Sequence, residues 1–217
     1  MAHELIDTGG SRSFPEPHAL LAATTDRSDI VLIVGAHAAG ALHALREPER
    51  YAAILVELGT ECLGVHTGET RGEEGSNVLG FARFRLGSAP PSDCVEVVRQ
   101  PRTPDAALAA ARRTFEAHGL KVAVCGDFPG RIIDRLVRPY YNAALKRLDE
   151  GLANAADLDT TLKLGLGYPE GPIALLERTG LAEHYDVTDS LYEALGDPAY
   201  LPARRARVAK LRQRGNS

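Results

Sequence analysis

Two glycines and a glutamate near the start of the chain have the types and spacing of a nucleotide site. The apolar run Asp29–Val34 is followed by Gly35, by Gly40 and then by an alanine- and leucine-rich helical segment. Glu57 follows Gly35 by about 20 residues, where the ribose-binding acid of a dinucleotide loop is expected. The middle glycine of such a loop lets the backbone approach the pyrophosphate, but His37 occupies that position. Its imidazole would crowd the phosphates, so the fingerprint is degenerate.

A carboxylate further along the chain is a second candidate for chemistry. Glu96 stands within the apolar run Cys94–Val98, where burial would raise the pKa of its carboxyl group. Pairing with Arg83, Arg85 or Arg131 is the alternative interpretation.

Basic and imidazole side chains complete the candidates. Arg131, Arg135 and Arg138 would share one face of a helix, and Lys163 precedes a glycine-rich turn. These positions suit an anionic ligand, although a salt-bridged surface is the commoner outcome for such a stripe. His66 lies in the loop of residues 64–75, where it is either a solvated side chain or a base that folds back on the site.

The elements that position these residues alternate between strands and helices. Residues 1–27 are rich in Gly, Ser, Pro and Thr and are expected to form a flexible arm. Alternation of strand and helix over residues 28–126 predicts a mostly parallel α/β sheet. The predicted strands are Asp29–Val34, Ala52–Val56, Val78–Phe84, Cys94–Val98 and Lys121–Cys125, with a helix over Pro104–His118.

Residues 127–217 are expected to be helical. A long helix is predicted from an Asp127 cap and Pro129 to the residues before Gly151. Asn154 and Asp157 indicate the start of a second helix. The run Gly165–Pro172 holds three glycines and two prolines, which predicts a turn that redirects the chain before another helix.

Composition limits the class of protein. The chain has 217 residues, 44% of them hydrophobic, and a net charge of −4, which indicates a soluble globular protein and gives no reason to expect a nucleic-acid partner. No apolar run approaches the roughly 20 residues of a membrane span. Cys62, Cys94 and Cys125 are odd in number and widely spaced, so reduced thiols, no metal site and a cytoplasmic location are expected.

The order of small motifs over residues 75–210 resembles the 3-hydroxyacyl-CoA dehydrogenase family. The resemblance implies an α/β plus all-α fold, in which an abbreviated Rossmann-like, mostly parallel sheet precedes a helical dimerisation domain. The matching segments are Pro129–Gly130, Arg135–Leu145, Glu150–Gly151, Ala155–Pro172, Thr179–Leu181 and Leu195–Pro202.

The resemblance also implies where the family's catalytic groups would lie. The reaction is hydride transfer between C3 of a hydroxyacyl-CoA and NAD, with a glutamate-oriented histidine as the base. In this sequence the histidine position is Ala82, the glutamate is Glu96, and the expected asparagine is Asp134. Only Thr60 represents the family's serine-rich turn. A methyl group accepts no proton, and an anion repels a developing alkoxide.

The resemblance allows a second alignment of the start of the sheet with the family. In this alignment Asp29–His37 matches the family strand that ends beyond the nucleotide phosphates, and the glycine loop with its ribose-binding acid is missing. The degenerate fingerprint with Gly35, Gly40 and Glu57 is the alternative. NAD binding is doubtful in both. Two functions follow: a non-catalytic homodimer that retains acyl-CoA binding, or an active oxidoreductase with an altered site.

Overall fold

The computed structural model describes residues 2–215, which form two compact units. Unit 1 comprises the chain up to Arg85 together with Pro91–Ile132, and unit 2 comprises Leu86–Pro90 together with the chain from Ile133 onward. The boundary predicted at residues 126 and 127 therefore differs from the observed one by a short turn. The segment Leu86–Pro90 joins unit 2 because Ser88 N–H donates to the carbonyl of Thr179.

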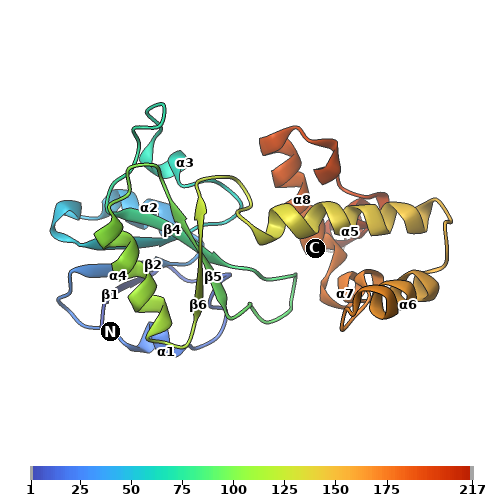
Figure 1. Cartoon of the computed structure of the whole chain (residues 1–217), viewed down its shortest axis with the longest axis horizontal. Coiled ribbons are helices and arrows are strands. Elements are labelled where there is room, and N and C mark those ends of the chain that lie inside the picture. The colour runs from blue at the N-terminus through green and yellow to red at the C-terminus, as the bar shows by residue number, and fades with distance from the viewer. Residues whose placement is uncertain (1, 216–217) are drawn as a thin grey trace. The chain divides into compact units, whose positions relative to one another are not determined.

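Unit 1 is built on a six-stranded sheet whose strands follow chain order (Figure 1). All neighbouring pairs are parallel except β4 and β5, which are antiparallel. The prediction of a mostly parallel sheet is confirmed. The strands are β1 (Glu4–Asp7), β2 (Ile30–Val34), β3 (Ala53–Glu57), β4 (Val78–Arg83), β5 (Cys94–Arg99) and β6 (Lys121–Gly126).

Both faces of this sheet are covered, which explains the continuous apolar runs of its central strands. Every residue of β2 and of β3 is buried. One face packs Leu32 and Phe81 against helix α4 (Asp105–Glu116), and the opposite face packs Ile33 against helix α2 (Ala38–Ala44). Shorter elements are α1 (Ala19–Ala22), α3 (Gly64–Thr67) and the 3₁₀ turns η1 (Pro48–Arg50) and η2 (Pro198–Tyr200), the last in unit 2.

The amino-terminal segment is not the flexible arm that its composition predicts. Glu4–Asp7 pairs in parallel with β2 and forms one edge of the sheet. The loop after β1 also bonds to the loop after β2, because Ala36 N–H donates to the carbonyl of Gly9 over 2.7 Å. These backbone hydrogen bonds order a segment whose Gly-, Ser- and Pro-rich composition predicts a flexible arm.

The strand order bears directly on the nucleotide hypotheses. In a doubly wound nucleotide-binding sheet the order reverses near the first strand, and the ligand occupies the crevice at that reversal. Among the described strands the order runs from β1 to β6 without reversal. Unit 1 therefore lacks, within residues 2–132, the switch point on which a dinucleotide fingerprint depends.

Unit 2 is helical, as predicted, and its helices have the expected end signals. Asn154 accepts a hydrogen bond from Asp157 N–H and caps α6, and Pro172 opens α7. Gly151 follows the end of α5 with a positive φ of 73°. The helices are α5 (Ile133–Asp149), α6 (Ala155–Leu166), α7 (Pro172–Thr179), α8 (Leu181–Leu195) and α9 (Arg204–Gly215).

The start of the long helix was predicted too early. Helix α5 begins at Ile133, after a turn in which Arg131 has a φ of 52°. Asp127 caps a different element: its carboxylate accepts from the N–H groups of Leu63 and Gly64, at the start of α3. No helix within residues 2–215 is both long and apolar enough to cross a membrane.

Candidate functional site

Ala82 and Glu96 form a directly opposed pair in the antiparallel ladder of β4 and β5. Both side chains are buried, with exposed fractions of 5% and 3%. Opposed residues of such a ladder have Cβ atoms about 5 Å apart. A histidine at position 82 would therefore meet the Glu96 carboxylate, whereas alanine leaves that carboxylate without an imidazole across the strands.

Glu96 is instead held by groups at the end of unit 1. Its Oε1 accepts from Ile132 N–H at 2.9 Å, and its Oε2 lies 3.8 Å from Arg131 Nε. This ion pair confirms the structural interpretation that paired Glu96 with Arg131. Arg83 does not take part, because it donates to the carbonyls of Ser13 and Ser92.

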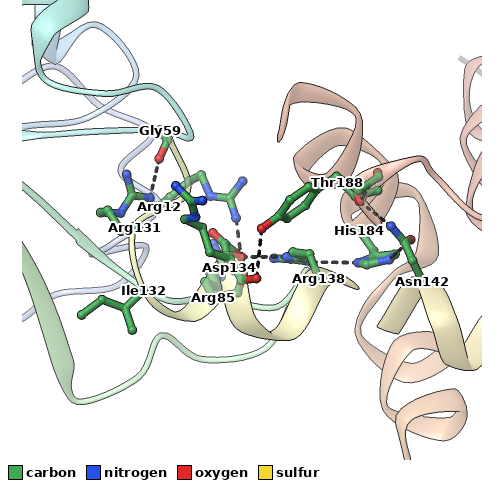
Figure 2. Close-up of polar contacts among 12 residues, drawn as sticks. Arg12, Gly59, Arg85, Arg131, Ile132, Asp134, Arg138, Asn142, His184 and Thr188 are labelled. Carbon is green, nitrogen blue, oxygen red and sulfur yellow. Dashed lines mark hydrogen bonds and ion pairs between the residues drawn. The ribbon is translucent and has the colours of Figure 1, made fainter. Parts of the chain in front are cut away.

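The predicted basic stripe is not present. Arg131 precedes α5, is only 6% exposed, and donates through Nη2 to the carbonyl of Gly59 at 2.6 Å (Figure 2). Arg138 is 1% exposed and belongs to the interior of unit 2. A stripe that shares a face requires all three residues on one helix, and Arg131 lies outside it.

Asp134 lies in a buried polar chain within unit 2. Figure 2 shows the Arg138 guanidinium between the Asp134 carboxylate and the His184 ring. Arg138 donates to Asp134 Oδ1 at 2.7 Å and to His184 Nδ1 at 3.0 Å. Because Nδ1 accepts, Nε2–H of His184 donates to Asn142 Oδ1 at 3.1 Å, and the Asn142 amide donates to Thr188.

The environment of this chain keeps the histidine neutral. Burial, with the adjacent Arg138 cation, lowers the pKa of His184 to about 3. The carboxylate of Asp134 thus serves as the anionic partner of a fully buried guanidinium. Its charge is committed to Arg138, which a sequence pattern based on spacing alone does not show.

Glu57 also has a structural role that differs from ribose binding. Its Oε1 accepts from Ser13 N–H at 2.7 Å and its Oε2 from Gly35 N–H at 2.8 Å. The carboxylate therefore ties the loops after β1 and β2 to the end of β3. The hydroxyl groups of a ribose would have to displace two backbone N–H donors to reach the Glu57 carboxylate.

The two glycines of the fingerprint differ in their surroundings. Gly35 has a φ of +105°, and a Cβ there would lie 2.5 Å from the carbonyl oxygen of Gly9. At Gly40, a Cβ would meet nothing within 4 Å. Gly35 is thus required by the neighbouring loop, and Gly40 has no conformational or packing requirement. Together with Glu57, these residues do not fit a dinucleotide, so no step of a reaction can be assigned through NAD at this loop.

The remaining predicted ligand residues lie in unit 2. Lys163 is exposed on α6. Arg135 is half-buried on α5, where its carbonyl accepts from the Tyr200 hydroxyl at 3.0 Å. Among residues 2–215 no group of three His, Cys, Asp or Glu side chains is placed to hold a metal ion. The three cysteines are free, and burial raises the pKa of Cys125 to about 11.

The pairing of His66 with Glu61 was not predicted from the sequence. His66 lies on α3, and its Nε2 is 3.3 Å from Glu61 Oε1. Hydrogen bonds, including one from Gly59 N–H, lower the pKa of the Glu61 carboxyl group despite partial burial. Glu61 also lines a small cavity together with Arg12 and Gly35. The five-residue spacing within a short loop was the available signal, but only the turn of α3 brings the two side chains together.

The fold and these residues define a two-part protein: a mostly parallel α/β unit followed by a helical unit. Residues 130–215 match the family described as 3-hydroxyacyl-CoA dehydrogenase, C-terminal domain. The 3-hydroxybutyryl-CoA dehydrogenase of Bradyrhizobium diazoefficiens is 34% identical over 117 residues, which is 54% of this chain and 40% of that one. Human mitochondrial hydroxyacyl-coenzyme A dehydrogenase is 36% identical over 99 residues, 46% and 32% of the two chains.

Solved structures agree. The (S)-3-hydroxybutyryl-CoA dehydrogenase PaaH1 of Ralstonia eutropha superposes with a TM-score of 0.67 at 25% identity, over 83% of this chain and 64% of that one. FadB2 of M. tuberculosis gives 0.68 at 21% identity, over 89% and 70%, and supports the fold alone. The resemblance to the 3-hydroxyacyl-CoA dehydrogenase family is thus confirmed over residues 130–215, and the chain spans less than half the length of the curated relatives named above.

Proposed function

We propose that this protein binds a CoA ester but does not carry out hydride transfer by the histidine–glutamate route of its family. The observation that carries the proposal is the opposition of Ala82 and Glu96 in one antiparallel pair. The glutamate that would orient a base is present, and the position across from it bears a methyl group. General-base catalysis is worth about 10²–10⁴ in rate, so its loss alone would leave very little turnover.

Two further contacts support this conclusion. Asp134 stands where the family's asparagine is expected, and its charge is paired with Arg138. An anion in that position does not donate a hydrogen bond to a substrate oxygen. Glu57 is committed to Ser13 and Gly35, which argues against a ribose contact.

CoA-ester binding is inferred from the relatives, whose names specify hydroxyacyl-CoA and hydroxybutyryl-CoA substrates. Among the predicted ligand residues, Lys163 of α6 is the exposed cation, and Arg135 of α5 is half-buried. Arg131 and Arg138 are excluded from that role by their burial. We therefore expect Lys163 to contact the phosphates of the CoA ester.

A titration tests the proposal directly. Purified protein is titrated with acetoacetyl-CoA by calorimetry and with NADH by nucleotide fluorescence, and absorbance at 340 nm is followed with both present. We expect binding of acetoacetyl-CoA without NADH oxidation, and several-fold weaker binding in Lys163→Gln. NADH oxidation by the purified protein contradicts the proposal, as does a failure to bind the CoA ester.

One observation favours the alternative, an active oxidoreductase with an altered site. The Glu61–His66 pair supplies a carboxylate-oriented imidazole in unit 1. If acetoacetyl-CoA is reduced, His66→Gln should abolish the reaction and Ala82→Gly should not. A reaction that survives His66→Gln would exclude this pair as the base.

Assembly as a homodimer is the second part of the proposal, and helix α6 supports it. None of its 12 residues is buried within the chain, although the helix carries several leucines. Leu164 is 83% exposed and Leu166 62%, and the neighbouring Leu152 is 69% exposed. A second copy would cover this apolar surface.

Light scattering tests the dimer. We expect twice the monomer mass at micromolar protein, and the monomer mass for Leu164→Glu. The matched control is Leu211→Glu on α9, a leucine that is 60% exposed, which should leave the mass unchanged. A monomer at all accessible concentrations contradicts assembly but leaves the CoA-ester proposal standing.

A further inference from the structure

Unit 2 contains an aromatic cavity that the proposed function does not use. It has a volume of about 310 Å³ and is lined by Tyr140 and Tyr141 of α5 and by Tyr168 and Glu170 of the turn before α7. Figure 1 shows this turn between α6 and α7, in the same unit as α5. The volume lies at the lower end of the range of small-molecule sites.

The three rings stand at steep angles to one another. The planes of Tyr140 and Tyr141 are inclined by 50° with centroids 5.4 Å apart, and those of Tyr140 and Tyr168 by 73° with centroids 5.9 Å apart. Each ring face carries the negative part of the aromatic quadrupole. Rings inclined in this way can present more than one such face to a single guest, as in the aromatic cages that hold methylated ammonium groups.

The charge of the cavity wall has the matching sign. Among the described residues that line it, Glu170 is the charged one, and Lys and Arg side chains are absent from that lining. Burial and the neighbouring Tyr168, Tyr141 and Asp159 raise the pKa of Tyr140 to about 12. The Tyr140 ring is therefore a neutral phenol at physiological pH, and the negative wall charge comes from Glu170.

Glu170 is held by a neighbour that a cationic guest can replace. Arg178 donates to Glu170 through Nε at 3.0 Å and through Nη2 at 2.6 Å. The two side chains are 57% and 33% exposed, respectively. Because solvent reaches both side chains, their ion pair is weak, and the carboxylate can turn to a cation in the cavity at small cost.

We propose that this cavity binds a quaternary or methylated ammonium group. The tyrosine rings would surround the methyl groups, and Glu170 would supply the counter-charge. The site lies entirely within unit 2 and requires neither a dinucleotide nor a CoA ester. Its test is therefore independent of the proposed function.

The experiment compares two probes of nearly equal shape. Choline carries a trimethylammonium group, and 3,3-dimethyl-1-butanol replaces the charged nitrogen by carbon. Binding to the full-length protein is measured by NMR shifts of the probe methyl groups. We expect choline to bind at least tenfold more tightly than the neutral probe, and increased salt to weaken choline binding.

Three variants make the result specific. Tyr168→Phe keeps the ring and should bind choline within about threefold of wild type, while Tyr168→Leu should bind at least fivefold more weakly. Tyr168 is 42% exposed, so both variants should fold. Glu170→Gln should also weaken choline binding, because Arg178 is then left unpaired beside the cavity.

A matched aromatic outside the cavity serves as the control. Phe128 of unit 1 is 60% exposed, and Phe128→Leu should leave choline binding unchanged. Equal affinity for the two probes, no binding of either, or full choline affinity in Tyr168→Leu would each overturn the proposal.

Discussion

Ala82 of β4 and Glu96 of β5 face each other as a direct cross-strand pair, and Glu96 in turn lies 3.8 Å from Arg131. Glu96 thus lies across the ladder from a methyl group and is paired with a guanidinium. This relationship can be tested without any assumption about ligands.

An imidazole introduced at position 82 should report the carboxylate across from it. In Ala82→His we expect the imidazole pKa, read from its ring-proton NMR shifts, to exceed that of the double variant Ala82→His/Glu96→Gln by about 1–2 units. The reason is that an opposite charge at close range favours the protonated ring. Equal pKa values in the two variants would show that the side chains do not meet.

Gly35 and Gly40 should respond oppositely to alanine. Gly35→Ala forces a Cβ to 2.5 Å from the Gly9 carbonyl at a φ of +105°, and should lower the free energy of unfolding by roughly 2–4 kcal/mol. Gly40→Ala lies in helix α2 with open space around it, and should raise stability by about 0.5–1 kcal/mol. Urea unfolding of both variants checks this, and equal effects would contradict the loop contact.

Removing the charge of Asp134 should destabilise unit 2. Asp134→Ala leaves the buried guanidinium of Arg138 without its carboxylate, and should cost about 3–5 kcal/mol. The control is Arg147→Gln, because Arg147, near the end of the same helix, forms an exposed pair with Glu150 and should change stability by at most about 0.5 kcal/mol. A loss below about 1 kcal/mol in Asp134→Ala would show that the buried pair is not formed.

Acid should destabilise the protein through His184. Its pKa is about 3 when folded and about 6.5 when unfolded, so the unfolded chain binds the additional proton between these values. The contribution of His184 to the free energy of unfolding is therefore fully present above pH 6.5. It is lost as the pH decreases toward 3, by about 1.4 kcal/mol per pH unit.

The matched measurement compares wild type with His184→Gln. Glutamine can accept from Arg138 and donate to Asn142 without titrating. From pH 7.5 to pH 5 we expect the wild type to lose about 2 kcal/mol more than the variant. Parallel pH dependence in the two proteins would place the proton uptake elsewhere.

Most of the secondary structure was predictable from the sequence, because local patterns are sufficient for it. Continuous apolar runs predicted the buried strands β2 and β3, and the Asn154 cap and Pro172 predicted the starts of α6 and α7. The family relationship over the helical unit followed from the order of such local motifs. Residues 216 and 217, predicted as helical, lie outside the described residues.

The partners of the polar residues were not predictable from the sequence, because they depend on how the chain folds. Glu57 has the spacing of a ribose ligand, but the adjacent loops supply Ser13 and Gly35 N–H as its donors. Strand β1 forms because β2 offers it a free edge, which its own residues do not reveal. Hydrogen bonds between segments far apart in sequence depend on where the backbone brings them, and residue spacing carries no record of that placement.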